Sequence, residues 1–222
     1  MVETPARKLA VLVHADVAGS TALVQANESL AHERIRDIFQ EFAKKISGYG
    51  GTAHEVRGDA LVAEFARASD AVSASLSFQS ENRARNQSVT DGIRPVVRIG
   101  IAIGEVVVAD NTVTGEGIVL AQRLEQLSEP GGVCIQDAAY QTIPRRLPFH
   151  YRKLGECNLK GFDEPVRAYI VELAPGAEIP QSEGPHEGVP TPEQQSSGLP
   201  DRPSIAVLPF VNVSSDPEQE FL

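Results

Sequence analysis

Cysteine is scarce in this sequence, and its scarcity excludes two classes of protein. Only Cys134 and Cys157 occur among the 222 residues. They are too few for a disulfide framework and have no partners at the spacing of a metal site. No apolar run approaches the length of about 18 residues that a membrane span needs, and the opening MVETPARK lacks the apolar stretch of a signal peptide. We therefore expect a cytoplasmic protein with no membrane partner.

Basic residues are also in the minority. The chain carries 20 Lys and Arg against 30 Asp and Glu, for a formal net charge of −10. Because nucleic acids are bound by basic surfaces, this balance argues against nucleic acid as a partner. It leaves room for a nucleotide, which needs only a local cationic site. The apolar fraction of 41% and charged fraction of 23% are typical of a globular protein with a core, and the length allows one ordinary domain and something smaller.

The first half of the chain alternates strand-like and helix-like segments. Residues 8–15, KLAVLVHA, form an apolar run typical of a buried strand, and the small residues of VAGST suit a tight turn after it. The elements expected next are a helix over 29–47, strands over 52–57 and 60–65 joined through Gly58 and Asp59, and a helix over 69–85.

The sequence VRIGIAIGEVVV predicts a strand with two unequal faces. Bulky and small side chains alternate along it, with Val97, Ile99, Ile101 and Ile103 on one face and Arg98, Gly100, Ala102 and Gly104 on the other. A bare sheet face lets a ligand or another backbone approach closely. Beyond it we expect a turn near residues 110–111, a helix over 115–128, a strand at GVCIQ, a short helix over 138–143 and a closing β-hairpin within 149–173.

The composition changes abruptly at residue 175. Seven of the 15 prolines fall within 175–203, among Gly, Ser, Gln and Glu, which is typical of a flexible linker. SIAVLPFVNV then predicts a strand within 204–222. Because one strand cannot form a domain alone, we expect the start of a second domain there, after a first domain that spans residues 7–174.

Two aspartates mark the candidate chemistry. Asp16 ends the first strand and Asp59 lies in the hairpin, so neighbouring strands would bring both carboxylates to one edge of a sheet. Paired carboxylates beside a phosphate-bearing substrate are what Mg²⁺ or Mn²⁺ requires. Ala18, Gly19 and Ser20 can offer backbone N–H groups to a phosphate at a helix start. Each aspartate also has a plainer alternative, because aspartate is common in turns and at helix caps.

Two arginines have plain alternatives as well. Arg98 can pair with an acidic neighbour on its half-bare strand. Arg123, in LAQRLEQL, has the pattern of a solvated helix residue. Spacing alone therefore supports only the hypothesis of a phosphate-and-metal site.

Five segments together resemble a known family. They are ADVAGST, EVRGDALVAEF, VRIGIAIGEVVV, TGEGIVLAQRLEQLSEPGGVCI and LGECNLKGFDEPVRAYIV. In this order they are similar to the class III adenylate/guanylate cyclase catalytic domain, over roughly residues 7–173. The resemblance implies an α/β sandwich with a ferredoxin-like βαββαβ core, a mainly antiparallel sheet, and a head-to-tail homodimer with the active site at the subunit interface. The linker and DRPSIAVLPFVNVSSDPEQEF resemble bacterial cyclases that continue into a TolB-like or TPR region.

The resemblance assigns roles to individual residues. Asp16 and Asp59 match the aspartates that hold two divalent metal ions, Mg²⁺ or Mn²⁺, with the backbone carbonyl of Val17 as a further ligand. Arg123 matches the arginine that stabilises the transition state from the partner chain. The residues assigned to the phosphates are Gly19, Ser20, Thr21, Arg98 and Lys160.

Two positions depart from the family's pattern. Val119 stands where the family has an asparagine that orients the ribose. Valine can neither donate nor accept a hydrogen bond, and we expect it to pack within its helix. Glu55 stands where adenylate cyclases carry lysine and guanylate cyclases carry glutamate. An ionised glutamate only accepts hydrogen bonds, which suits the N1–H and exocyclic amine of guanine. Thr112 occupies the second base-recognition position, where bacterial members often have threonine.

The implied function is that of a nucleotidyl cyclase in intracellular signalling. The ribose 3′-hydroxyl of ATP or GTP attacks the α-phosphorus, and a 3′,5′-cyclic nucleotide and pyrophosphate result. Val119 predicts weak activity, because loss of a positioned polar group typically costs on the order of 10²–10³ in rate. One alternative is a degenerate cyclase domain that binds nucleotide or dimerises as a regulatory module. Another is an unrelated phosphate-binding or structural α/β domain.

Overall fold

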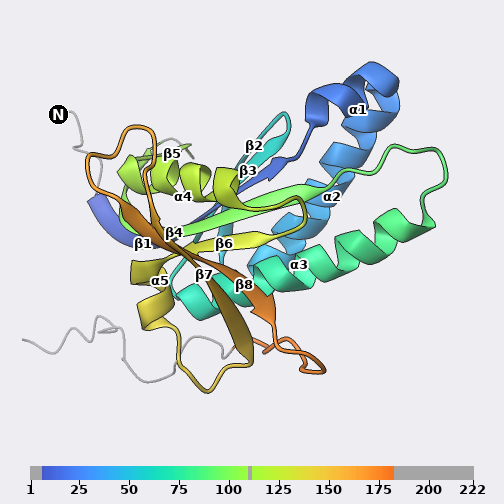
Figure 1. The fold of residues 1–222 in the computed structure, drawn as a ribbon. Coiled ribbons are helices and arrows are strands. Elements are labelled where there is room, and N and C mark those ends of the chain that lie inside the picture. Colours follow the sequence, from blue (N-terminus) through green and yellow to red (C-terminus); the bar gives the residue numbers. More distant parts are fainter. Residues whose placement is uncertain (1–6, 110–111, 183–222) are drawn as a thin grey trace, which may run out of the picture. The chain divides into compact units, whose positions relative to one another are not determined.

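Thirteen helices and strands are formed by residues 7–109 and 112–182, the part of the chain that the computed structural model describes (Figure 1). For residues 55–57, 108–109 and 112–113 only the backbone is described. In chain order the elements are β1 (Arg7–Val17), α1 (Ser20–Ala26), α2 (Glu28–Gly48), β2 (Thr52–Arg57), β3 (Ala60–Phe65), α3 (Ala68–Ser88), β4 (Val97–Ala109), β5 (Thr112–Thr114), α4 (Glu116–Leu127), β6 (Val133–Gln136), α5 (Asp137–Thr142), β7 (Phe149–Cys157) and β8 (Val166–Leu173).

All the strands belong to one sheet, with helices against both of its faces. The strand order is β2-β3-β1-β4-β6-β8-β7, and β5 pairs with β4 beside this path. Neighbouring strands run antiparallel except β4 and β6, which run parallel. In chain order, β1, α2, β2, β3, α3 and β4 give the βαββαβ pattern. The predicted α/β class, with a ferredoxin-like core and a mainly antiparallel sheet, is therefore confirmed.

Strand β1 contributes side chains to two separate hydrophobic cores. Successive side chains of a strand point to opposite faces of the sheet. Val11 and Val13 accordingly belong to the core that α2 and α3 cover, and Leu12 belongs to the core that α4 covers. Phe42 of α2 and Phe78 of α3 stack in the first core, with ring centroids 4.3 Å apart. Because both faces of β1 are covered, the position of its last residues is fixed.

The bare face of β4 is the face on which α4 packs. A Cβ built at Gly100 would lie 2.0 Å from the carbonyl oxygen of Ala121, and one at Gly104 would lie 2.5 Å from the Cα of Gly117. Any side chain larger than hydrogen at these two positions would push the helix off the sheet. Of the two alternatives for the bare face, a ligand or another backbone, the structure shows a backbone.

The turn predicted at VAGST leads into a short helix, α1, where no helix was expected before residue 29. Asn27 separates α1 from α2 with extended dihedral angles, φ −161° and ψ 99°. Its side-chain oxygen accepts a hydrogen bond from the backbone N–H of Leu30 at 3.1 Å, which makes it the N-cap of α2. Helix α1 buries no side chain, so it leaves no hydrophobic period in the sequence.

The rest of the second half agrees with the expected elements, with one addition. The hairpin expected within 149–173 is formed by β7 and β8. Strand β5 was not predicted, because three residues are too few to show a period of two. The turn expected near residues 110–111, the linker from residue 183 and the strand expected within 204–222 lie outside the described residues. None of the described helices is long and apolar enough to cross a membrane.

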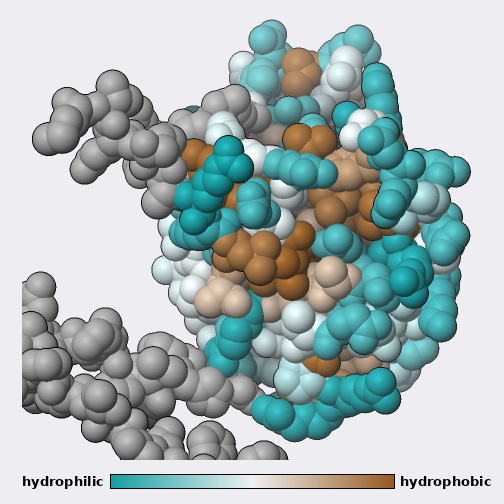
Figure 2. All heavy atoms as spheres, turned by 90° about the vertical axis from the view of Figure 1, so that its left-hand side faces the viewer, coloured by the Kyte–Doolittle hydropathy of each residue, from teal (hydrophilic) through white to brown (hydrophobic). Residues whose placement is uncertain are grey.

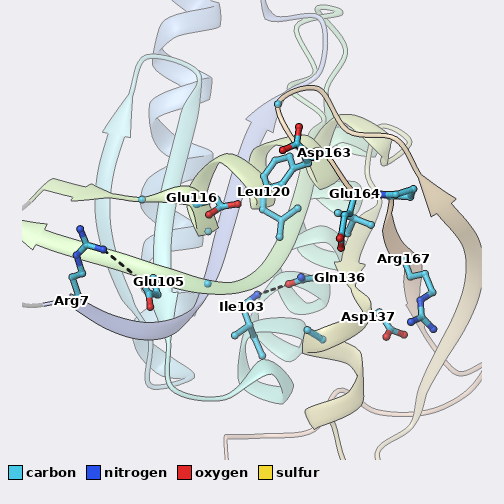
Figure 3. A pocket seen from close by; sticks show the side chains of 18 of the residues that line it. Arg7, Ile103, Glu105, Glu116, Leu120, Gln136, Asp137, Asp163, Glu164 and Arg167 are labelled. Carbon is cyan, nitrogen blue, oxygen red and sulfur yellow. Dashed lines mark hydrogen bonds and ion pairs between the residues drawn. The ribbon is translucent and has the colours of Figure 1, made fainter.

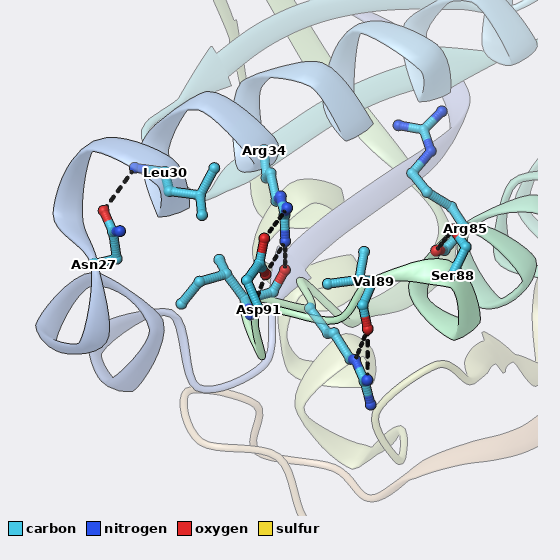
Figure 4. A network of polar contacts seen from close by, with 9 residues as sticks. Asn27, Leu30, Arg34, Arg85, Ser88, Val89 and Asp91 are labelled. Carbon is cyan, nitrogen blue, oxygen red and sulfur yellow. Dashed lines mark hydrogen bonds and ion pairs between the residues drawn. The ribbon is translucent and has the colours of Figure 1, made fainter.

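The connection between α3 and β4 is held in place by polar contacts (Figure 4). Arg34 of α2 donates a hydrogen bond to Asp91 Oδ1 at 2.6 Å. Two asparagines of α3 donate to the carbonyl oxygen of Pro95 at 3.0 and 2.8 Å. The next residue, Val96, accepts a hydrogen bond from the N–H of Ala18 at 2.8 Å. These contacts fix the start of β4 beside the end of β1.

Candidate active site

Asp16 lies at the edge of the sheet where β1 ends, between its two neighbouring strands. It is level with Ala60 of β3 and Arg98 of β4, and its side chain is 25% exposed. Arg98 Nη2 donates a hydrogen bond to Asp16 Oδ2 at 3.2 Å. Burial raises the pKa of Asp16, the negative charge of Asp59 raises it further, and the contact with Arg98 opposes both. The two aspartates are therefore close enough for their charges to interact.

Asp59 is tied to the end of β1 by its backbone and by its side chain. It follows Gly58, whose φ of 61° makes the tight turn between β2 and β3. The carbonyl oxygen of Asp59 accepts a hydrogen bond from the N–H of Val17 at 3.0 Å, and its Oδ2 accepts one from Ser20 Oγ at 2.5 Å. The structure thus brings Asp16 and Asp59 to the same edge of the sheet.

The turn from β1 into α1 presents backbone groups beside the two aspartates. Gly19 has a left-handed φ of 68°, which lets the chain reverse direction there. Ser20 and Thr21 open α1, where backbone N–H groups have no acceptor within the helix. The expectation for Ala18 is wrong, because its N–H donates to the backbone carbonyl just ahead of β4. That hydrogen bond leaves it no N–H for a phosphate.

Arg98 joins Asp16 to a carboxylate that the sequence analysis missed. Glu125 of α4 is 1% exposed, and its Oε1 lies 2.7 Å from Arg98 Nε. The N–H is not aligned for a hydrogen bond, so this contact is an ion pair. On the other side of Glu125, His14 Nδ1 lies 3.8 Å from Oε2. Arg98 thus pairs with two acidic neighbours in this structure, and its predicted role in binding phosphate stays a prediction.

Burial dominates the ionisation of His14 and Glu125. It lowers the pKa of His14 to about 4. It also raises the pKa of Glu125 to about 7, although Arg98 opposes this shift. A signal for Glu125 exists in the sequence, because it follows Ala121 by four residues and so lies on the same face of α4. That face packs on the strand that carries Arg98.

A second group of predicted residues lies on α4 and in the loop after β7. Arg123 Nε donates to the backbone carbonyl of Lys160 at 3.1 Å, and Arg123 Nη1 donates to Gln126 Oε1 at 3.2 Å. Arg123 is thus held by the protein and is not a freely solvated side chain. Within residues 7–109 and 112–182, no hydrogen bond or ion pair joins this group to the two aspartates.

Val119 lies one turn before Arg123 on α4 and is 41% exposed. The expectation that Val119 packs within its helix is therefore wrong. The face of α4 towards the sheet is already occupied, by Leu120, Ala121 and Leu124. Val119 projects from a different face and presents an apolar side chain to solvent.

The two base-recognition positions lie on strands near each other. Glu55 belongs to β2 and Thr112 belongs to β5, and the backbones of these strands are in contact range. Only the backbone is described at both positions. Their roles in choosing a base therefore stay predictions.

The groups around Asp16 fit a hard divalent cation. Carboxylate oxygens of Asp16 and Asp59 and the carbonyl oxygen of Val17 are the kind of ligand that Mg²⁺ and Mn²⁺ prefer. A cation would relieve the repulsion that raises the pKa of Asp16. No cluster of three or more His, Cys, Asp or Glu suited to a metal occurs in the described part of the chain. Water and phosphate oxygens would therefore have to complete the coordination.

A cavity of about 970 Å³ lies away from these residues (Figure 3). It is bounded by β4, the start of α4 and the loop before β8. None of the predicted site residues lines it. Its walls carry two arginines, Arg7 and Arg167, against five carboxylates, so the excess negative charge would repel a triphosphate. The carboxylates are Glu105, Glu116, Asp137, Asp163 and Glu164. We do not place the chemistry there.

Comparison with known proteins agrees with the fold. The sequence profile described as "Adenylate and Guanylate cyclase catalytic domain" matches residues 2–173. The chain belongs to this family. The predicted membership of the adenylate/guanylate cyclases is thereby confirmed. The TolB-like region expected after the linker stays a prediction.

Individual cyclase-family proteins show the same similarity. A protein of Rhizobium meliloti (strain 1021) named "Putative adenylate cyclase 3" is 30% identical over 220 residues, which make up 99% of this chain and 36% of that protein. The chain thus spans little more than a third of that relative's length. The crystal structure of an adenylate/guanylate cyclase/hydrolase from Silicibacter pomeroyi covers 78% of this chain and 99% of its own, with 29% identity and a TM-score of 0.69. The adenylyl cyclase CyaB of P. aeruginosa covers 76% of this chain and 96% of its own, with 27% identity and a TM-score of 0.65.

Proposed function

We propose that this cyclase-family domain converts a purine nucleoside triphosphate, ATP or GTP, to a 3′,5′-cyclic nucleotide and pyrophosphate. The observation that carries the proposal is the placement of Asp16 and Asp59 at one edge of the sheet, beside the open start of α1. Carboxylates and helix N–H groups together are what a metal-bound triphosphate needs. The cyclic product would serve as a signal.

Asp16, Asp59 and the carbonyl of Val17 would hold two divalent cations, Mg²⁺ or Mn²⁺. When bound, the cations lower the pKa of the ribose 3′-hydroxyl and neutralise charge on the phosphates. The protein's own groups then orient the triphosphate. Gly19, Ser20 and Thr21 supply backbone N–H donors.

Three cationic side chains complete the proposed site. Arg98 and Lys160 bind phosphate oxygens, and Arg123 faces the negative charge that develops at the α-phosphorus in the transition state. Such preorganised charge is usually the largest single contribution to catalysis. The hydrogen bond from Arg123 to the backbone of Lys160 supports this role, because it keeps the guanidinium beside the second cationic residue before substrate binds.

A head-to-tail homodimer would bring the two groups of residues together. On one chain, Arg123 and the two aspartates share no hydrogen bond or ion pair among the described residues. A second copy can supply Arg123 to the aspartates of the first. Figure 2 shows hydrophobic side chains gathered within a hydrophilic surface on one face of the molecule, and such patches mark interaction surfaces.

A degenerate domain that binds nucleotide without turning it over is the second candidate. The exposed apolar side chain of Val119 favours it, because the family has a hydrogen-bonding asparagine at that position. Glu55 would favour GTP over ATP as the bound nucleotide, since an acceptor-only side chain suits guanine better than adenine.

The deciding experiment is a turnover assay on the purified protein with Mn²⁺ and either ATP or GTP. We expect cyclic nucleotide from the wild type and from Asp37→Ala, a control on the exposed face of α2. We expect none from Asp59→Ala. Nucleotide binding by the wild type with no more product than Asp59→Ala would overturn the proposal in favour of the degenerate domain.

A further inference from the structure

Arg98 stands between two carboxylates of very different exposure. Its Nε lies 2.7 Å from Oε1 of Glu125, which is 1% exposed. Its Nη2 lies 3.2 Å from Oδ2 of Asp16, whose side chain is 25% exposed. The shorter ion pair is therefore the buried one. The guanidinium is anchored from inside the domain and reaches Asp16 with an outer nitrogen.

The packing of α4 on the sheet holds Glu125 in this place. A Cβ added at Gly100 would lie 2.3 Å from the backbone nitrogen of Glu125, so helix and strand are in direct contact at this residue. His14 borders the other side of the carboxylate. A buried ionised carboxylate needs a cation beside it. Arg98 is the one arginine or lysine within ion-pair distance of Glu125 in the described part of the chain.

We propose that Glu125 is a positioning residue, which holds Arg98 through Nε and thereby limits the hold of Arg98 on Asp16. One oxygen of Asp16 then stays open to a divalent cation. This inference rests on the proposed cyclase function, in which Asp16 is a metal ligand. A guanidinium and a metal ion compete for the same carboxylate. An arginine with no other anionic partner would bind Asp16 through two nitrogens, the stronger arrangement.

The test is the affinity of the folded protein for Mn²⁺ alone, measured at pH 8 by electron paramagnetic resonance of the free ion. Glu125→Gln removes the charge, and Glu125→Asp keeps the charge but shortens the side chain by one carbon. We expect both to bind Mn²⁺ about tenfold more weakly than the wild type, the usual effect of losing a partner of a metal ligand. Glu129→Gln, at an exposed position of the same chain, is the matched control and should bind normally.

The two variants separate positioning from a simple change of charge. If Glu125→Gln weakens Mn²⁺ binding and Glu125→Asp does not, the negative charge at residue 125 matters and its exact position beside Arg98 does not. That result overturns the inference. Unchanged binding in both variants overturns it as well. A wild type that binds no Mn²⁺, or that binds it as well as Asp59→Ala does, overturns the proposed metal site and this inference together.

A measurement on the unaltered chain covers the case in which neither variant folds. The Nε–H resonance of Arg98, identified as the one that Arg98→Lys removes, should exchange slowly with solvent because Nε faces the buried Glu125. Rapid exchange, like that of exposed arginines, would overturn the inference.

Discussion

The buried pair of His14 and Glu125 predicts an unusual dependence of stability on pH. Burial lowers the pKa of His14 from 6.5 to about 4 and raises that of Glu125 from 4.5 to about 7. Between pH 4.5 and 6.5 the unfolded chain binds a proton at His14 that the folded chain does not. Over the same range the folded chain binds a proton at Glu125 that the unfolded chain does not. These two differences in bound protons have opposite signs. We therefore expect their effects on the free energy of unfolding to cancel in the wild type.

Replacing either residue should uncover the effect of the other. Both side chains are less than a tenth exposed, so solvent screens their ionisation little. A slope of about 1.36 kcal/mol per pH unit gives a change of roughly 2.5 kcal/mol across this window. Glu125→Gln leaves His14, and its free energy of unfolding should rise by that amount relative to wild type as pH increases. His14→Gln leaves Glu125, and its free energy of unfolding should fall by a similar amount.

Urea denaturation followed by circular dichroism, at a series of pH values, measures both slopes. His32→Gln, at an exposed position on α2, is the control and should follow the wild type. Slopes of the opposite sign, or none in either variant, would refute the assignment of burial as the cause. An ion pair of charged His14 and ionised Glu125 would give another result. The wild type would then lose stability as pH rises above 6.5, because the folded state would keep the His14 proton longer.

Three substitutions test other parts of the structure. Gly100→Ala should lower the free energy of unfolding by about 3 kcal/mol, because its Cβ would meet backbone atoms of α4. In urea denaturation Gly48→Ala, with nothing within 4 Å, is its control. Val119→Asn should raise turnover on the order of 10²-fold in a cyclic-nucleotide assay, and no gain would contradict the alignment of residues 111–123 with the family. Glu55→Lys should shift the ratio of kcat/KM values from GTP towards ATP, and an unchanged ratio would argue against a role in base recognition.

The parts of the fold that could be predicted are those in which side-chain size repeats along the chain. The alternation along β4 indicated both a strand and a close approach at its bare face, and α4 lies there. Helix α1 could not be found in this way, because none of its side chains is fully buried and it ends at Asn27, whose side chain caps the next helix, α2. Strand β5 is too short to carry a pattern.

The candidate site likewise contains residues that could be predicted from the sequence and residues that could not. Asp16 and Asp59 could be singled out because each interrupts or ends an apolar run, where a carboxylate has no packing role. His14 lies near the end of the apolar run KLAVLVHA, where one polar residue hardly disturbs the pattern. Glu125 lies in the amphipathic segment LAQRLEQL, where a glutamate is typical of a solvated helix face. Their contact depends on α4 packing against β1 and β4, which joins segments far apart in the chain. Sequence alone does not contain that pairing.

The separation of Arg123 from the two aspartates has a genetic consequence. In the proposed homodimer, each active site draws its aspartates from one copy and its Arg123 from the other. A cell that expresses an Asp59→Ala allele and an Arg123→Ala allele together would form mixed dimers with one intact site. Such sites would number about a quarter of those in the wild type. Each allele alone would be null. The two would complement each other, so only cells that express both alleles would make the cyclic nucleotide.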